Sequence, residues 1–307
     1  MRLLVDSASL WYRAFYGMPE SVSSTTDLPN NAIKGFFDGL ARIVTKYRPD
    51  EIAICLDDNW RPQWRVDLYP GYKLNRVDSE SVEEGGEEEP DLLTPQIGPI
   101  IELCTLLGLH PISVEDQEAD DVIATLATSP AVSQSSKSVR VMTGDRDLFQ
   151  LLKFPHDIQV IYLAKGISQH ELVDRGYIEN RYGIPFDRYG LFAAIRGDAS
   201  DGLPGIKGIG EKGAAAIVKS FTSMKEIIVA AQSDSMELAS IHRKRILADL
   251  DYARIAEDIV TCRTDLVVAD DDLSKWREKS DLIEFRRRAK EWELGSTIER
   301  ITAALDI

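Results

Sequence analysis

The sequence predicts an α/β fold in which a mainly parallel sheet is flanked by helices and is followed by a helical second half. Three short apolar runs, each ending in a polar turn, have the pattern of buried strands: residues 2–6, 51–57 and 139–143. Helical periodicity fills much of the chain between them. A chain that alternates strand, helix and strand builds a parallel sheet. After about residue 165 we expect no further strand, so a smaller helical domain or subdomain should follow.

The helix expected after the first strand begins near Asn31, a residue type that favours the N-cap, and Pro49 closes the segment. Its apolar residues recur at intervals of three and four: Ile33, Phe36, Phe37, Leu40, Ile43, Val44 and Tyr47. Residues 97–107 and 119–127 repeat this pattern. Each of these helices therefore has one apolar side that can pack against the sheet.

Composition narrows the kinds of site that the chain can build. The 307 residues include 44% hydrophobic ones, enough for about two domains with a buried core. There is no apolar run of about 18 residues and no secretory signal pattern, so we expect a cytoplasmic protein. The three cysteines form no C-x-x-C pair and the four histidines are scattered, which excludes a disulfide framework and a thiolate zinc site. Any metal must be held by oxygen atoms, which favours Mg²⁺ or Mn²⁺.

Acidic residues dominate the charge, with 51 acids, 36 bases and a net charge of −15. Eight of the acids lie between Asp78 and Asp91 without a single base, a composition that predicts a mobile, solvated loop. Setting aside this segment and the nine carboxylates described next leaves the rest of the chain close to neutral. The acidic net charge therefore does not exclude a nucleic-acid partner, because local surface patches can still be basic.

Carboxylates follow the predicted strands at the points where those strands end. Asp6 and Asp57 end the first two strands, and Asp145 comes one turn after the third. Because parallel strands share one carboxyl edge, these acids should gather there. Further acids open the 119–127 helix and occupy the turn at 197–202. The nine candidates are Asp6, Asp57, Glu118, Asp120, Asp121, Asp145, Asp147, Asp198 and Asp201.

Each acid taken singly has a structural explanation, as an N-cap or as a first-turn residue that the helix dipole favours. Taken together the nine acids need a further explanation, because carboxylates within ~6 Å of each other repel and raise one another's pKa. A cluster of this kind requires a cation. Two Mg²⁺ or Mn²⁺ ions ~4 Å apart would neutralise it and could serve in-line hydrolysis of a phosphodiester.

A glycine-rich turn at 205–213 contains the spacing G-x-G-x-x-G. A dinucleotide site is excluded because a polar turn and Pro204 precede the glycines instead of a strand, and no G-K-[ST] follows to make a Walker A loop. The remaining interpretation is a helix, a tight turn and a second helix. The backbone N–H groups of the turn and the dipole of the second helix could bind a phosphate. Lys207, Lys212 and Lys219 surround it with positive charge. A plain connection between two helices is the alternative.

Bases and aromatic rings alternate after Asp57. Residues 60–76 contain four of each, a combination used to bind single-stranded nucleic acid: Trp60, Arg61, Trp64, Arg65, Tyr69, Tyr72, Lys73 and Arg76. Two later basic clusters, 242–245 and 286–288, are typical of solvated helix faces, with contact to a DNA backbone as the alternative.

The order and spacing of these motifs resemble the 5′-nuclease (flap endonuclease) family, most closely the 5′-3′ exonuclease domain of bacterial DNA polymerase I. The motifs that carry the resemblance cover about the first 220 residues: Leu3-Leu4-Val5-Asp6-Ser7, Arg13-Ala14-Phe15, Tyr72-Lys73-Leu74-Asn75-Arg76, the segment 118–127, the segment 143–150, Gly197-Asp198-Ala199-Ser200-Asp201 and the segment 203–212. Because no polymerase domain follows residue 307, the resemblance predicts a free-standing nuclease.

The resemblance implies a PIN-like 5′-nuclease fold with a helical arch and a helix-three-turn-helix DNA-binding subdomain. It implies a nuclease core at 1–165, with the arch region at 58–92, and a helical DNA-binding region at 166–307, with the helix-three-turn-helix at about 187–220. The family's metal-binding carboxylates fall on Asp6, Asp57, Glu118, Asp120, Asp145, Asp147, Asp198 and Asp201, and Asp121 falls on an adjacent acid.

By the same resemblance, Lys73 falls on the basic residue at the base of the arch that acts on the scissile phosphate, and Arg76 falls on its basic neighbour. The residues expected to bind DNA are Gly205, Lys207, Gly208, Gly210 and Lys212. The implied cofactors are two or more Mg²⁺ or Mn²⁺ ions, with K⁺ in the helix-three-turn-helix. The implied reaction cleaves 5′ flaps and 5′ ends of nicked or gapped duplex DNA to leave 5′-phosphates, in replication and repair, by a monomer.

Two departures from the family pattern stand out. Gly202 replaces a common Asn, and Cys55-Leu56-Asp57-Asp58 replaces a more usual Phe-Asp pattern. The acidic segment 78–91 lies where the arch should be. Two other functions are compatible with these residues: a non-catalytic, structure-specific DNA-binding protein with an idle acidic pocket, and an RNA-directed nuclease.

Overall fold

The computed structural model describes all residues except 20, 24, 77–91, 136, 234 and 270–272. The acidic segment from Asp78 to Asp91, and with it much of the expected arch, lies outside the described residues. Within the described residues, no helix is both long and apolar enough to cross a membrane.

Six strands form one sheet in the order β3-β2-β1-β4-β5-β6. Their bounds are β1 Arg2–Asp6, β2 Glu51–Cys55, β3 His110–Ile112, β4 Val139–Thr143, β5 Ile158–Tyr162 and β6 Glu171–Val173. All neighbouring pairs are parallel except β5 and β6, which are antiparallel. The prediction of a mainly parallel sheet is confirmed, but the expectation that strands stop after residue 165 is wrong. The strand β6 was missed because three residues are too few to establish a period.

Helices cover both faces of the sheet. The first half of the chain contains α1 Ser7–Gly17, α2 Asn31–Tyr47, α3 Gln63–Leu68, α5 Thr94–Leu106, α6 Ala119–Ala127, α7 Pro130–Ser135 and the 3₁₀ helix η1 Asp147–Lys153. The second half contains the 3₁₀ helices η2 Ile167–Gln169 and η3 Phe186–Arg188, and the α-helices α8 Arg175–Tyr182, α9 Tyr189–Arg196, α10 Glu211–Val218, α11 Met224–Gln232, α12 Ser240–Ala248, α13 Leu250–Val260, α14 Trp276–Lys279, α15 Leu282–Glu291 and α16 Thr297–Leu305.

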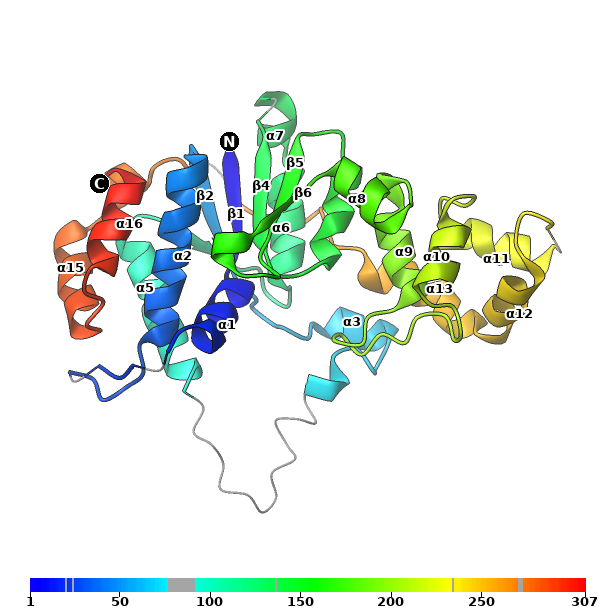
Figure 1. Ribbon diagram of the computed structural model, residues 1–307, viewed down its shortest axis with the longest axis horizontal. Coiled ribbons are helices and arrows are strands. Elements are labelled where there is room, and N and C mark those ends of the chain that lie inside the picture. Colours follow the sequence, from blue (N-terminus) through cyan, green and yellow to red (C-terminus); the bar gives the residue numbers. More distant parts are fainter. Residues whose placement is uncertain (20, 24, 77–91, 136, 234, 270–272) are drawn as a thin grey trace, which may run out of the picture.

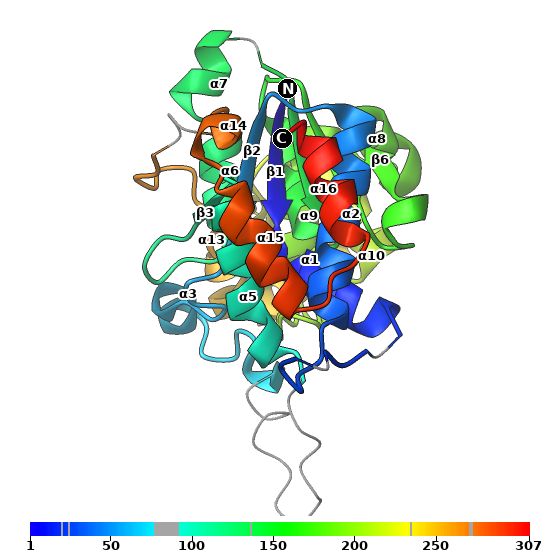
Figure 2. The same ribbon diagram turned by 90° about the vertical axis from the view of Figure 1, so that its left-hand side faces the viewer.

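Alternate residues of β1 bury into two different cores, because successive side chains of a strand point to opposite faces. Leu3 and Val5 pack with the apolar sides of α2, α5, α15 and α16, whereas Leu4 packs with α6, η1 and the helices that follow them. The helix α2 begins at Asn31, so Asn30 and not Asn31 is the N-cap, and it ends at Tyr47, after which Arg48 takes the left-handed conformation. Figure 2 shows α15 and α16 standing in front of the sheet on the same side as α2.

The last two helices, together with α14, therefore return to the sheet and do not join α10 to α13. Phe285 of α15 packs edge-on against Phe37 of α2, with ring centroids 6.5 Å apart. The indole N–H of Trp276 donates to the carbonyl of Leu305 at 3.1 Å. Figure 1 places α15 and α16 at one end of the molecule and α10 to α13 at the other.

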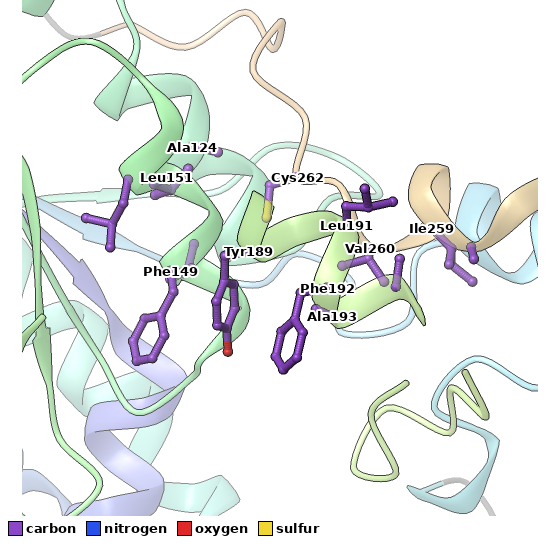
Figure 3. Packing of buried hydrophobic residues seen from close by; sticks show 14 of the residues in the cluster. Ala124, Phe149, Leu151, Tyr189, Leu191, Phe192, Ala193, Ile259, Val260 and Cys262 are labelled. Atoms are coloured by element: carbon purple, nitrogen blue, oxygen red, sulfur yellow. The ribbon is translucent and has the colours of Figure 1, made fainter. Parts of the chain in front are cut away.

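A continuous aromatic core joins the sheet to the helical end. Phe149 of η1 lies 5.3 Å from Tyr189 of α9, and Tyr189 lies 5.8 Å from Phe192, measured between ring centroids. All three side chains are fully buried, and Figure 3 shows them in a row between the two parts. The glycine-rich turn lies between α9 and α10, as the sequence predicts. This core fixes the turn relative to the carboxyl edge of the sheet.

Candidate active site

An open cavity of about 960 Å³ lies at the carboxyl edge of the sheet. Five of the nine candidate carboxylates line it: Asp6, Asp57, Glu118, Asp120 and Asp145. Lys73 and Arg76 also line it, together with aromatic residues of α1 and the ring of Trp60. The shared edge of parallel strands has therefore brought together acids that lie far apart in the sequence.

Asp6 and Asp57 each cap a helix and also face the cavity. The Asp6 carboxylate accepts hydrogen bonds from the backbone N–H of Ser9 at 3.1 Å and from the hydroxyl of Thr143 at 2.6 Å. Asp57 Oδ1 accepts the backbone N–H of Ala119 at 2.7 Å, so it caps α6 from the neighbouring strand. The structural and functional explanations of these acids are thus compatible, because capping fixes the carboxylates without removing them from the cavity.

Asp145 and Asp147 are held by a tight turn after β4. Thr143 Oγ1 accepts the N–H of Asp145 at 2.8 Å, and Asp145 Oδ1 accepts the N–H of Asp147 at 2.8 Å. The Asp147 side chain points into the interior, where its Oδ1 atom is buried and has no hydrogen-bond partner among the described residues. A buried carboxylate oxygen without a donor is costly, and a bound cation would satisfy it.

The cavity acids raise one another's pKa. Burial, followed by the charges of Asp145 and Asp6, raises the pKa of Asp120 well above its ordinary value. Burial and the charge of Asp201 raise the pKa of Asp145 to about 6. Burial and Asp145 likewise raise the pKa of Asp147 well above its ordinary value. Carboxylates that repel each other in this way have the oxygen donors and the charge that a hard divalent cation prefers.

Asp198 and Asp201 lie in the turn before the glycine-rich segment and do not line the cavity. The backbones of Asp198 and Leu203 form a reciprocal pair of hydrogen bonds at 2.9 and 2.8 Å, which closes the turn. Asp201 is nevertheless near enough to raise the pKa of both Asp145 and Asp147. Asp198 and Asp201 therefore lie beside the carboxylates that line the cavity, on the side of η1.

Gly202 is explained by the backbone that faces it. Its φ is +68°, and a Cβ atom there would lie 2.6 Å from the carbonyl oxygen of Gly71. The next turn also depends on this contact, because the N–H of Lys73 donates to the carbonyl of Asp201 at 2.8 Å. The departure from Asn at this position thus lets the 71–73 turn approach Asp201 closely, and it displaces no carboxylate.

Asp121 belongs to the interior and not to the cavity. It is fully buried, and its two oxygens accept hydrogen bonds from the Arg65 guanidinium at 2.7 and 2.9 Å. The backbone N–H of Arg263 donates to the same carboxylate at 2.8 Å. Arg65, which is also buried, reaches Glu118 at 2.5 Å. This arginine is a countercharge that holds Asp121 and orients Glu118 toward the cavity.

The alternation of bases and rings at 60–76 does not form an exposed surface for a single strand. Arg65 and Tyr72 are buried, and the Tyr72 hydroxyl donates to Glu118 at 2.8 Å. Arg61 donates to the backbone carbonyls of Tyr72 and Pro70 at 2.6 and 2.7 Å. The stacking interpretation is therefore wrong for Arg65 and Tyr72, whose side chains are buried and hold Glu118.

Lys73 and Arg76 are the two bases of this segment that reach the cavity acids. Lys73 forms an ion pair with Glu118, and its Nζ lies 4.0 Å from Asp201. Arg76 contacts Asp201 at 2.5 Å. Burial alone would lower the pKa of Lys73, but the charges of Glu118 and Asp201 outweigh it and raise the pKa. Lys73 is therefore cationic at neutral pH, and both bases lie beside the carboxylates.

Three residues near the site were not singled out by the sequence. Tyr12 and Tyr16 of α1 line the cavity and are 52% and 80% exposed. Their four-residue spacing directly after Asp6 was an available signal, since a helix that starts at a strand's carboxyl end must pass over that edge. Arg196, 3.6 Å from Asp198, has both terminal nitrogens buried and without a hydrogen bond among the described residues. We find no sequence signal that would have identified it.

The carboxylates are not all arranged as ligands of an ion in this conformation. Within the described ranges, no three His, Cys, Asp or Glu side chains converge on one point as a metal site requires. Side chains of the protein already occupy some of the carboxylate oxygens. Arg65, Tyr72 and Lys73 contact Glu118, and Arg76 contacts Asp201. A cation would have to exchange with some of these donors.

The basic cluster at 286–288 is a solvated helix face. Arg286 pairs with Glu299 at 2.6 Å, Arg287 with Glu284 at 2.5 Å and Arg288 with Glu102 at 2.7 Å. Every one of these arginines has an acidic partner, so none supplies uncompensated charge. The alternative that this cluster contacts a nucleic-acid backbone has no support.

Comparisons with known proteins agree with this geometry. Residues 1–183 match the family model "5′-3′ exonuclease, N-terminal resolvase-like domain", and residues 184–281 match "5′-3′ exonuclease, C-terminal SAM fold". The chain is 38% identical to a 5′-3′ exonuclease of Mycobacterium tuberculosis, covering 99% of this chain and 97% of that protein. It is 36% identical to a 5′-3′ exonuclease of Streptomyces coelicolor, covering 99% of each. The thermostable DNA polymerase I of Thermus aquaticus is 31% identical over 96% of this chain and 32% of its own length.

Solved structures confirm the PIN-like 5′-nuclease fold. The T5 5′-exonuclease with bound zinc matches with a TM-score of 0.67 at 16% identity, over 100% of this chain and 99% of that one. The catalytic core of Rad2 in complex with a DNA substrate matches with a TM-score of 0.54 at 18% identity, over 99% of this chain and 90% of that one. Two family models that together span residues 1–281, and relatives that match from end to end, lead to one conclusion: the chain belongs to the 5′-3′ exonuclease family.

Proposed function

We propose that this protein is a structure-specific, divalent-metal-dependent 5′ nuclease that acts on DNA as a 5′-3′ exonuclease and flap endonuclease and leaves 5′-phosphates. The observation that carries the proposal is the group of buried, mutually repelling carboxylates in a cavity that two cationic side chains also line. Membership of the 5′-3′ exonuclease family supports the same reaction. A role in DNA replication and repair is part of the proposal.

The metal ligands proposed are eight of the nine candidates: Asp6, Asp57, Glu118, Asp120, Asp145, Asp147, Asp198 and Asp201. They fit Mg²⁺ or Mn²⁺ because all their donors are oxygens, because the Asp147 Oδ1 atom has no partner, and because their repulsion needs a countercharge. Asp121 is left out, since Arg65 and a backbone N–H already occupy its oxygens. When bound, two or more ions would stabilise the charge that develops on the phosphodiester.

Lys73 and Arg76 are proposed to act on the scissile phosphate. Both are cationic and both lie at the cavity against carboxylates, so an arriving phosphate would compete with Glu118 and Asp201 for them. The N–H groups of Lys73 would then donate to a non-bridging phosphate oxygen. Because the backbone of Lys73 is bonded to Asp201, the side chain would remain positioned during this exchange.

The duplex part of the DNA is proposed to lie on the glycine-rich turn through Gly205, Lys207, Gly208, Gly210 and Lys212. Gly205 and Gly208 have φ values of +66° and +84°, and a Cβ atom on Gly205 would lie 2.5 Å from the Arg196 backbone. Gly205 is buried and packs against the end of α9, whereas Gly208 and Gly210 are exposed, so their backbone N–H groups would reach a phosphate without interference from a side chain. A K⁺ ion held by main-chain carbonyls of the turn, and a monomeric nuclease, complete the proposal.

A 5′-labelled double-flap substrate tests the proposed reaction. We expect short 5′-phosphorylated products in Mg²⁺ or Mn²⁺, and loss of cleavage in Asp145→Asn and Asp147→Asn. Asp187→Asn, the same change at an acid that does not line the cavity and pairs with Arg188, is the matched control and should cleave normally. Cleavage that persists in excess EDTA would contradict metal dependence.

The same assay separates the two other functions. A DNA-binding protein with an idle pocket would bind the flap and leave it intact in every metal. An RNA-directed nuclease would cleave an RNA flap faster than the DNA flap of the same sequence. Faster cleavage of the DNA flap supports the proposal.

A further inference from the structure

The C-terminal end of α13 is held by two side chains from the first half of the protein. The last carbonyl groups of a helix have no partner within the helix, so they must be satisfied from outside. The Arg65 guanidinium donates from Nε to the carbonyl of Ile259 at 3.2 Å, and the Gln150 amide donates to the carbonyl of Val260 at 3.0 Å. Both side chains are buried.

Gln150 makes further contacts that reach the acids of the site. It is 2% exposed, so its amide group must find its partners inside the protein. Besides Val260, the amide nitrogen donates to the carbonyl of Asp147 at 2.9 Å, and the amide oxygen accepts the backbone N–H of Cys262 at 3.0 Å. One buried side chain thus joins the first turn of η1 to the end of α13.

The segment η1 depends on such an outside contact. It is a 3₁₀ helix of seven residues, Asp147–Lys153. The hydrogen bonds of a 3₁₀ helix have poorer geometry than those of an α-helix, and runs beyond three or four residues are uncommon. The first residue of η1 carries the buried Oδ1 atom that has no hydrogen-bond partner among the described residues. Contacts from other elements must therefore help to fix this carboxylate.

Glu118 is connected to the same end of α13. Arg65, which donates to the carbonyl of Ile259, also donates to the Glu118 carboxylate at 2.5 Å. Figure 3 shows Val260 and Cys262 in the buried cluster that includes η1. The end of α13 thus supports one acid from η1 and another from the start of α6.

We propose that Gln150 is a positioning residue of the metal site: by joining the first turn of η1 to the end of α13, it places the Asp147 carboxylate where a divalent cation can bind it. The inference rests on the proposed metal-dependent nuclease function. Gln150 does not line the cavity, so it acts through the backbone of Asp147. Loss of an outer contact that orients a metal ligand typically weakens metal binding by about 10–100-fold.

Calorimetric titration of the full chain with Mn²⁺ alone tests the inference. Gln150→Met keeps the approximate size of the side chain and removes its amide group. We expect this variant to bind an Mn²⁺ ion roughly tenfold to a hundredfold more weakly than the unaltered chain. Its binding of a flap duplex in EDTA should be unchanged. Its single-turnover cleavage rate should be reduced at low Mn²⁺ and should recover as Mn²⁺ is raised.

Gln96→Met is the matched control, because Gln96 is an equally buried glutamine with the same kind of contacts. Its amide group donates to Asn31 and to the carbonyl of Leu92, and it accepts the N–H of Ala32 at 2.8 Å. None of these residues is a proposed metal ligand. Both substitutions remove buried hydrogen bonds, so both should lower the urea midpoint of the metal-free protein. Only Gln150→Met should change the affinity for Mn²⁺.

The two ways of failing are distinguishable. If Gln150→Met and Gln96→Met bind Mn²⁺ as tightly as the unaltered chain and all three proteins cleave the flap, the inference is overturned and the nuclease function stands. If the unaltered chain does not bind Mn²⁺, both are overturned.

Hydrogen exchange of the unaltered chain decides the question even if Gln150→Met does not fold. Coupling between two sites is reciprocal, so an ion that fixes Asp147 must also strengthen the contacts of Gln150. The N–H of Cys262, which donates to Gln150, should exchange roughly tenfold more slowly in Mn²⁺ than in EDTA. The N–H of Ala32, which donates to Gln96, should be slowed less. Equal slowing of the two N–H groups would contradict the inference.

Discussion

The raised pKa of Asp145 makes the metal-free protein lose stability as pH rises. Its carboxyl titrates at about 6 in the folded state, against an ordinary value of 3.8. Between these values the folded state binds more protons than the unfolded state, so the free energy of unfolding falls as pH rises through this window. A difference of about two pKa units, at ~1.4 kcal/mol each, corresponds to about 3 kcal/mol, of which about 2 kcal/mol is lost between pH 4.5 and 7.5.

Urea unfolding in EDTA at these two pH values measures the loss, and Asp145→Asn removes this titration together with the part of the raised pKa of Asp120 and Asp147 that the Asp145 charge causes. The pH dependence of the variant should therefore be smaller than that of the unaltered chain by at least about 2 kcal/mol. Adding Mn²⁺ at pH 7.5 should restore stability to the unaltered chain, because a ligand that binds only the folded state stabilises it. Equal pH dependence in the two proteins, or no stabilisation by Mn²⁺, would refute the reasoning.

Three other substitutions have expected outcomes. Arg65→Ala should lower the free energy of unfolding by about 3–5 kcal/mol in urea, because Glu118 would lose a countercharge and Asp121 would be left buried without one; a loss below about 1 kcal/mol would contradict the buried countercharge. Gly202→Asn should cost about 1–3 kcal/mol in the same assay, since its Cβ would meet the Gly71 carbonyl. Lys73→Ala should reduce the single-turnover cleavage rate by about 10²-fold or more while flap binding is retained, and an unchanged rate would exclude its action on the phosphate.

The carboxyl edge of the sheet could be predicted because it depends on strand ends alone. Asp6 follows Leu3-Leu4-Val5 and Asp57 follows the five apolar residues 52–56, so the parallel pairing of these two strands sets the place of both acids. Asp198 and Asp201 were candidates because they lie in a polar turn, and the motif resemblance assigned them to the family's metal-binding carboxylates. The short strands β3 and β6 were not predicted, because three residues are too few to show an alternation of apolar and polar side chains.

The interior partners of the site could not be predicted from the pattern. Arg65 belongs to a run of bases and rings that is typical of a nucleic-acid surface, and only the fold shows it inside an ion-pair network. The basic clusters at 242–245 and 286–288 are likewise alike in sequence. At 286–288 the acid Glu299 lies opposite Arg286, and this contact between separate helices cannot be read from the local pattern.

The row of rings formed by Phe149, Tyr189 and Phe192 bears on where this nuclease would cut. It packs the segment that carries Asp147 directly against the helix that leads into the glycine-rich turn. The glycine-rich turn and the cavity carboxylates would then move together. Aromatic packing would keep the distance between the duplex site and the cavity constant, so cleavage would occur at a constant number of nucleotides from the bound duplex.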